Sequence, residues 1–181
     1  DGMTNFSLLT ANKTMPMAYE AMKDSADAFL YPGHVDAVMG TRSGEAMLKE
    51  GVSGVVAGFT AKELLTAFAV ILVKFPQGKP FFKNCYPRVV KAEGSPAAQA
   101  LIKEVMEPCD SEWRGLGVIP QSGLQLRPAF AVCDARKKYG VPAMEGRANP
   151  ACRCGDILQG KCTPPQCPLF GKACVPTHAV G

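Results

Sequence analysis

Histidine, tryptophan and long apolar stretches are scarce in this sequence of 181 residues. There are two histidines, His34 and His178, and one tryptophan. Two histidines exclude a metal centre built from several imidazole ligands. The longest apolar run, residues 64–73, is interrupted only by Thr66 and is about half as long as the ~20 residues that a membrane span needs. It predicts a buried helix and no transmembrane segment.

Basic clusters and export signals are also missing. The net charge is +4, and lysine and arginine are scattered along the chain, which argues against a nucleic-acid partner. No basic start followed by an apolar stretch and a cleavage site marks a secretory signal. We therefore expect a cytoplasmic protein with no membrane attachment. Because the chain starts at Asp1 with residues typical of the middle of a domain, we also expect a fragment.

Cysteine, by contrast, is abundant. Of the eight cysteines, five fall between Cys152 and Cys174, whereas Cys85, Cys109 and Cys133 are spread singly. Disulfide-dense folds are small chains without a sufficient core, and the first part of this chain has the composition to build one. The clustering favours a local metal site in a reducing compartment, with extracellular disulfides as an alternative.

Strand and helix signals alternate before the cysteines. Thr60-Ala61-Lys62-Glu63 fits a capping box, in which the threonine hydroxyl and the glutamate carboxylate each bind a free backbone amide. Strands are expected at residues 5–11, 27–31 and 52–59, and helices at residues 16–23, 43–50, 64–75 and 96–106. This alternation predicts an α/β protein with a mostly parallel sheet flanked by helices, followed by a small irregular cysteine-rich region that binds a cluster.

The chain is expected to have three parts. Residues 1–108 would form the α/β domain, which we expect to be truncated at its N-terminus. Residues 109–147 would connect it, with short strands at 115–120 and 124–126 and a short helix at 134–139. Residues 148–181 would form the cysteine-rich iron-sulfur region. The proline-containing stretch 142–150 would be the linker between the last two parts.

Four cysteines carry the predicted chemistry. Cys154, Cys162, Cys167 and Cys174 are separated by seven, four and six residues. Structural zinc sites more often use cysteine pairs two to four residues apart, whereas a four-iron cube accepts thiolates from a wider loop. The spacing therefore favours an iron-sulfur cluster over zinc, which stays open as the alternative. Cys152, two residues before Cys154, is expected to be an ordinary thiol.

Other candidate residues have simpler interpretations. His34 could face a cleft at the end of a strand, although a loop histidine bonded to backbone is favoured. Residues 110–117 could be a polar functional turn, or a bend anchored by the indole of Trp113. Gly115-Leu116-Gly117 lacks the third glycine of a dinucleotide fingerprint. Cys85, Cys109 and Cys133 are expected to be structural thiols.

Several motifs together resemble the C-terminal half of the HypD family of nickel-iron hydrogenase maturation factors. The matching motifs are Asp27-Ala28-Phe29-Leu30, Pro32-Gly33-His34-Val35, Val56-Ala57-Gly58-Phe59, Arg88-Val89-Val90, residues 111–119 (SEWRGLGVI), Cys154-Gly155, Cys162, residues 166–171 (QCPLFG) and Cys174. They extend over nearly the whole chain.

This resemblance implies two similar α/β domains facing a cleft, and a third region that binds a 4Fe-4S cluster. Carried over by position, the ligands would be Cys154, Cys162, Cys167 and Cys174. The family acts as a scaffold with HypC, a small chaperone-like partner. On it the Fe(CN)2CO group of the hydrogenase is assembled, with cyanide delivered by a HypE-like protein. The cluster would pass electrons to cysteines in the cleft, so the protein would be a redox-active scaffold rather than a classical enzyme.

The sequence departs from the family pattern in three places. The family's N-terminal Cys-Gly-Gly-His-Thr-His and Gly-Pro-Gly-Cys-Pro-Val-Cys motifs have no counterpart, so the Fe(CN)2CO iron is expected only in a full-length protein. Asn12-Lys13 stands where the family tends to have a histidine. The Ser-Ser-Glu-Gly-Ala-Cys stretch that usually follows the cluster is also missing.

Overall fold

The computed structural model describes residues 4–142, 146 and 149–180. The chain divides into two compact units, one of residues 26–104 and one of residues 1–25 together with 105–181. The domain boundaries expected after residues 108 and 147 stay predictions, and the expected linker at 142–150 lies partly outside the described residues. Within the described part of the chain, no helix has the length and apolar character to cross a membrane.

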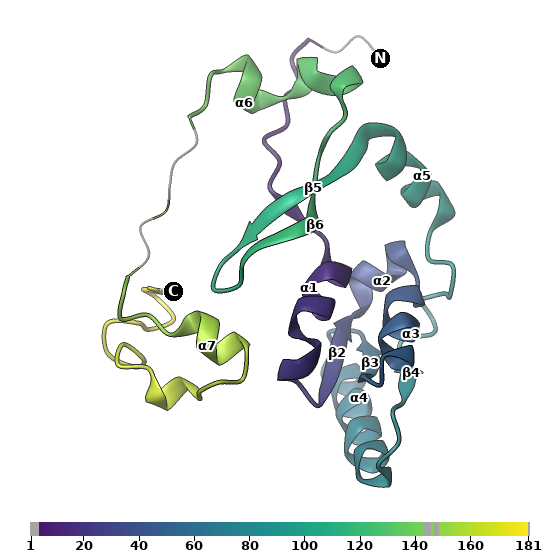
Figure 1. Cartoon of the computed structure of the whole chain (residues 1–181). Helices are drawn as coiled ribbons and strands as arrows, with labels where there is room; N and C mark the ends of the chain where they lie inside the picture. The colour runs from purple at the N-terminus through teal and green to yellow at the C-terminus, as the bar shows by residue number, and fades with distance from the viewer. Residues whose placement is uncertain (1–3, 143–145, 147–148, 181) are drawn as a thin grey trace. The chain divides into compact units, whose positions relative to one another are not determined.

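The unit of residues 26–104 contains a parallel sheet with helices between its strands (Figure 1). Its elements are β2 (Ala28–Pro32), α2 (Gly33–Met39), α3 (Arg42–Lys49), β3 (Ser53–Ala57), α4 (Ala61–Lys74), the 3-10 helix η2 (Phe75–Gln77), β4 (Phe82–Asn84) and α5 (Pro96–Val105), which ends at the unit's boundary. The strand order is β2-β3-β4, and both pairings are parallel. The predicted α/β class is confirmed.

The central strand β3 carries the core of this unit. All five of its residues are buried, as expected for the valine-rich run at 52–59. Ala67 of α4 is fully buried against Val55 and Ala57 of the strand. The expected capping box opens α4, because the Thr60 hydroxyl accepts from the Glu63 amide while the Glu63 carboxylate accepts from the Thr60 amide. The strand and the helix predicted here are both confirmed.

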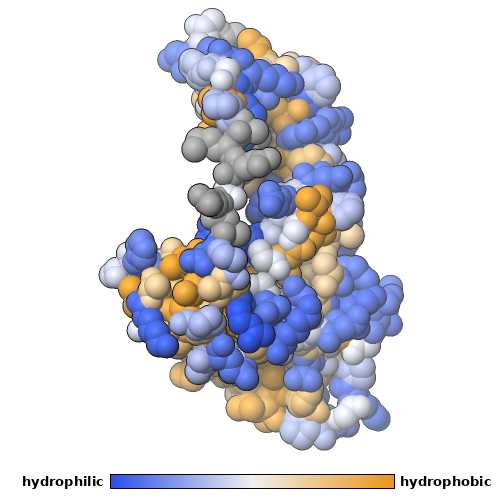
Figure 2. Space-filling model, turned by 60° about the vertical axis from the view of Figure 1, so that its left-hand side comes forward, coloured by the Kyte–Doolittle hydropathy of each residue, from blue (hydrophilic) through white to orange (hydrophobic). Residues whose placement is uncertain are grey.

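The outer face of α4 is apolar and exposed, so the expected buried helix is buried only on the side that packs against the sheet. Leu65, Leu72 and Val73 are 67%, 73% and 65% exposed. Figure 2 shows apolar residues gathered at the lower end of the view, where α4 lies in Figure 1. A helix that packs on a sheet buries only the stripe facing the sheet. The remaining apolar side chains of the run therefore meet solvent.

The second unit is built around an antiparallel sheet. Its strand order is β1-β6-β5, and both pairings are antiparallel. Its elements are β1 (Asn12–Lys13), α1 (Met15–Met22), η1 (Lys23–Ser25), β5 (Met106–Trp113), β6 (Gly117–Leu126), η3 (Pro128–Cys133), α6 (Ala135–Lys138), α7 (Cys154–Leu158) and η4 (Pro164–Gln166).

One long hairpin replaces the two short strands expected at 115–120 and 124–126. β5 pairs with β6 from Met106 to Trp113, with a register shift between Cys109 and Ser111. Proline explains why the strand pattern is weak here, since it cannot donate a hydrogen bond to a strand ladder. Pro108 lies on the edge strand β5 and Pro120 lies opposite the register shift, and these are positions where a sheet tolerates proline.

The strand expected at residues 5–11 does not form. Only Leu8 pairs there, donating to the Cys133 carbonyl and accepting from the Ala135 amide, and the short strand β1 follows at Asn12–Lys13. The segment has the composition of a strand, but η3 and α6 beside it offer no continuous ladder. The helices expected at 16–23, 43–50, 96–106 and 134–139 are confirmed as α1, α3, α5 and the shorter α6.

Leu72→Gln should change the free energy of unfolding by less than about 0.5 kcal/mol, because the side chain lies on the exposed face of α4. Val55→Ala, in the fully buried strand, should cost about 2 kcal/mol because it leaves a cavity. Urea unfolding followed by circular dichroism measures both. A cost at Leu72 as large as that at Val55 would show that the outer face is packed in solution.

Asp36 of α2 is 3% exposed, and burial raises its pKa from 3.8 to about 6. Between these values the folded chain binds more protons than the unfolded chain, so the free energy of unfolding should fall as pH rises from about 4 through 6. Asp36→Asn should remove about 2 kcal/mol of this decline. Urea titrations between pH 4 and 7.5 measure it, with the exposed Asp27→Asn as control. An unchanged slope in Asp36→Asn would refute the assignment.

Candidate functional site

The cysteine-rich segment folds as a succession of short turns. Its helices α7 and η4 have five and three residues. Gly160 and Gly171 adopt positive φ of 68° and 67°, a left-handed conformation that glycine adopts at little cost. Two isolated bridges, Phe170 to Cys174 and Val175 to His178, are the only strand-like pairings among the segment's described residues. This agrees with the irregular region expected from the sequence.

The four predicted ligands lie on different turns of this segment. Cys154 is the first residue of α7, and Cys167 follows η4. Cys162 and Cys167 are buried, with 9% and 8% exposure, while Cys154 and Cys174 are half-buried. The Val180 amide lies 3.5 Å from Sγ of Cys174, within reach of a weak N–H···S hydrogen bond. The assignment of all four as ligands stays a prediction.

Backbone amides lower the pKa of the Cys167 thiol below its usual value. The largest effect comes from the amide of Arg153, followed by those of Leu169 and Phe170. Interaction with amide groups stabilises the thiolate, which is the form that binds metals. This environment favours the thiolate form of Cys167.

Arg153 adds a positive charge beside two of the thiols. Its pKa is raised first by its hydrogen bond to Asp156 and then by its electrostatic interaction with Cys162 and, more weakly, with Cys167. The distance from Nε of Arg153 to Oδ2 of Asp156 is 3.1 Å. Sequence reasoning did not single out Arg153, although its position between Cys152 and Cys154 was a usable signal.

All eight cysteines are described, and all carry free thiols, so the structure contains none of the disulfides considered as an alternative. Within the described residues, no three histidine, cysteine or acidic side chains are placed to hold one metal ion. That finding concerns a single ion. A four-iron cube takes one thiolate at each of four separate iron atoms, so its ligands need not converge on one point.

Cys152 and Cys154 border a cavity of about 460 Å³. The other wall of this cavity is the turn of the β5–β6 hairpin, including Trp113, Arg114 and Gly115. The hairpin turn and the start of the cysteine-rich segment thus face each other, although they are far apart in the sequence. Sequence reasoning considered residues 110–117 as a bend anchored by tryptophan, but it did not connect that bend with the cysteines.

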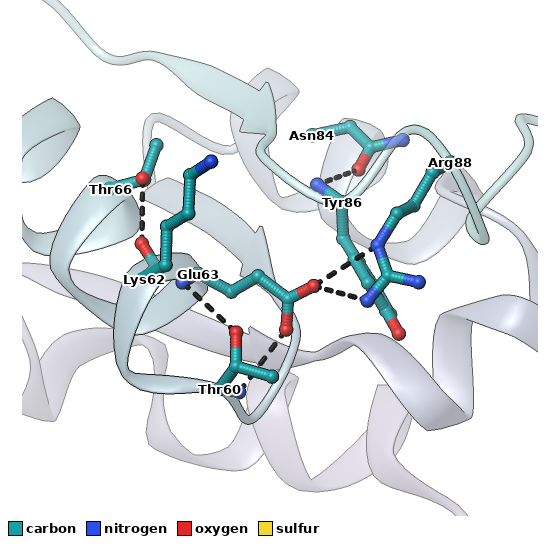
Figure 3. A network of polar contacts seen from close by, with 7 residues as sticks. All are labelled: Thr60, Lys62, Glu63, Thr66, Asn84, Tyr86 and Arg88. Carbon is teal, nitrogen blue, oxygen red and sulfur yellow. Dashed lines mark hydrogen bonds and ion pairs between the residues drawn. The ribbon is translucent and has the colours of Figure 1, made fainter.

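A second candidate site lies at the carboxyl edge of the parallel sheet. A cavity of about 450 Å³ is lined there by the first turn of α4 and by residues 85–88 after β4. Figure 3 shows the Glu63 carboxylate between Thr60 and Arg88. Nη2 of Arg88 lies 2.6 Å from Oε1 of Glu63, and its guanidinium stacks 4.7 Å from the centre of the Tyr86 ring. The hydrogen bond from Arg88 is the main reason why the pKa of Glu63 is lowered.

The remaining candidates lie outside the cysteine-rich segment. Burial raises the pKa of Cys85, which packs against the core cluster and also borders this cavity, so the protonated thiol is favoured. The structural role expected for it stays a prediction. Cys109 and Cys133 are half-buried in the other unit. His34 is exposed, and its ring lies 5.1 Å from that of Phe59. None of these residues lies in the cysteine-rich segment.

Comparisons with a family model and with known proteins point to the same family. The family model HypD, described as "Hydrogenase formation hypA family", matches residues 1–181. The chain is 35% identical over 191 residues to a hydrogenase expression/formation protein, HupD, of Azotobacter chroococcum mcd 1, covering 99% of this chain and 50% of the relative.

Two further relatives are named hydrogenase maturation factor HypD. The protein of Rhodobacter capsulatus is 36% identical over 100% of this chain and 51% of its own length. The protein of Escherichia coli K12 is 38% identical over 96% of this chain and 47% of its own length. The chain therefore spans about half the length of the curated relatives that it matches.

Proposed function

Since this chain belongs to the HypD family of hydrogenase formation proteins, we propose that it is the cluster-bearing part of a hydrogenase maturation scaffold. In this proposal Cys154, Cys162, Cys167 and Cys174 hold a 4Fe-4S cluster. The observation that carries it is the environment of Cys167, a buried thiol whose pKa is lowered by neighbouring backbone amides.

The chemistry of the residues present suits such a cluster. Cysteine thiolates are the usual ligands of iron-sulfur centres, and the segment supplies four of them on separate turns. Hydrogen bonds to the ligand sulfurs and burial tune such a centre. The Val180 amide donates to the Cys174 sulfur, and Cys167 is buried beside backbone amides that lower its pKa. The Arg153 guanidinium would offset part of the negative charge that four thiolates bring into the segment.

The chain's own residues would bind and tune the cluster rather than turn over a substrate. When bound, the cluster supplies one-electron transfer. The amides of Arg153, Leu169 and Phe170, which lower the pKa of the Cys167 thiol, would withdraw charge from its sulfur and so would favour the more reduced state of a bound centre. We infer that the electrons are passed on to cysteines that the other half of a full-length relative would contribute.

The wider assembly follows from the family and is part of the same proposal. A small HypC-like chaperone would carry the Fe(CN)2CO group as cargo while it is assembled, and a HypE-like protein would deliver cyanide. The chain spans about half the length of these relatives, so the proposal assigns to it only the cluster-bearing part. Free thiols in such number are typical of a reducing compartment, which supports a cytoplasmic location.

Anaerobic reconstitution of the chain with iron and sulfide should give about four iron atoms and about four sulfides per chain. Cys162→Ala removes one of the two buried thiols among the ligands and should reduce the iron content severely, because the cube then lacks a ligand. Iron and sulfide analysis measures both, together with the electron paramagnetic resonance spectrum of the reduced protein.

Cys152→Ala is the matched control, since it removes a half-buried thiol two residues from Cys154 that the proposal does not use. It should retain the iron content of the unmodified chain. Iron loss in Cys152→Ala with none in Cys154→Ala would transfer the ligand role to Cys152. About one zinc per chain and no iron, after purification without oxygen, would instead support a structural zinc module.

A further inference from the structure

The turn of the β5–β6 hairpin touches the start of α7 through two glycines. A Cβ atom placed on Gly115 would lie 2.6 Å from the Cα of Gly155, and one placed on Gly155 would lie 2.4 Å from the Gly115 carbonyl oxygen. Both distances are far below van der Waals contact, so neither backbone leaves room for a side chain on the other. The hairpin turn points toward α7 in Figure 1.

The hairpin side of this contact is well anchored. The indole Nε1 of Trp113 donates to Oγ of Ser122 over 2.7 Å, and this hydroxyl donates to the Ile119 carbonyl over 2.7 Å. Ser122 is fully buried. Buried hydrogen bonds of this kind are costly to break, because each partner would be left unsatisfied. The turn at residues 113–117 is therefore held firmly on the strands that carry it.

The short helix α7 on the other side of this contact depends on contacts with residues outside the helix. A helix of five residues is far too short to be stable by itself in water. Nε2 of Gln159, the residue after α7, lies 3.3 Å from the Gly115 carbonyl oxygen and donates to it. A cavity of about 460 Å³ lies beside the contact and borders Cys154 and Gly155 of α7. Cys154, the first residue of α7, directly precedes Gly155.

We propose that the hairpin turn is a positioning element for the cysteine-rich segment, with Gly115 holding the first turn of α7 and thereby fixing the sulfur of Cys154. Gly115 acts through Cys154 and does not itself bind the cluster. The role of this contact in cluster binding rests on the proposed function, in which Cys154 is a ligand. The contact between Gly115 and Gly155 itself is present in the chain without metal.

The turn provides its own matched control. Gly115 and Gly117 both adopt left-handed conformations, with φ of 79° and 77°, but nothing lies within 4 Å of a Cβ atom placed on Gly117. Gly115→Ala and Gly117→Ala therefore share the backbone strain of alanine at positive φ. Only Gly115→Ala adds a methyl group against α7.

Hydrogen exchange of the metal-free chain, followed by mass spectrometry, tests the contact directly. Gly115→Ala should speed exchange at residues 154–159 about tenfold relative to Gly117→Ala, because the displaced helix opens more often. Gly155→Ala should show the same increase from the other side of the contact. Gln159→Ala, which adds no atoms, should show a smaller change in the same direction. Trp113 fluorescence verifies that the hairpin remains folded.

Iron retention provides the second measurement. After reconstitution, Gly115→Ala should lose iron to a chelator several times faster than Gly117→Ala, because the proposed ligand Cys154 is no longer fixed. Equal exchange at residues 154–159 in the two variants would overturn the positioning role. If the unmodified chain binds no cluster while the exchange difference persists, the proposed function fails and the structural contact stands.

Discussion

The parallel sheet depends on the complete burial of β3. Every residue of this strand is buried, with β2 hydrogen-bonded on one side and β4 on the other. Burying the strand requires a helix on its face, and α4 supplies the fully buried Ala67 to the core cluster. Glu63 and Arg88 follow β3 and β4 and meet beyond the carboxyl ends of these strands, as Figure 3 shows.

The backbone of the cysteine-rich segment is ordered in a different way from that of the parallel sheet. It has no strand ladder beyond isolated bridges, and its helices are too short to persist alone. Its described residues are instead ordered by turns with left-handed glycines and by the hydrogen bond from the Val180 amide to the Cys174 sulfur. In the proposed function, bonds to iron would supply the remaining stabilisation, because a metal that binds only the folded state adds its binding free energy to folding.

Backbone contact joins the segment to the hairpin. Close approach of Gly115 and Gly155 requires that both residues lack a side chain, and the hydrogen bond from Trp113 to the fully buried Ser122 holds the hairpin partner in place. The motif around Trp113 and the first cysteine of the cluster motif therefore belong to one piece of structure. In the sequence they are two separate signals.

The sequence alone determined the capping box at Thr60, the buried valine-rich strand and most helices. It also determined that four cysteines lie together in an irregular coil. These features depend on residues a few positions apart, so their patterns can be interpreted without a fold. The tertiary structure decided which face of α4 stays exposed, that residues 5–11 lack a strand partner, and that Gly115 meets Gly155. Each of these depends on which distant segment the chain brings alongside, and no local pattern of side chains encodes that path.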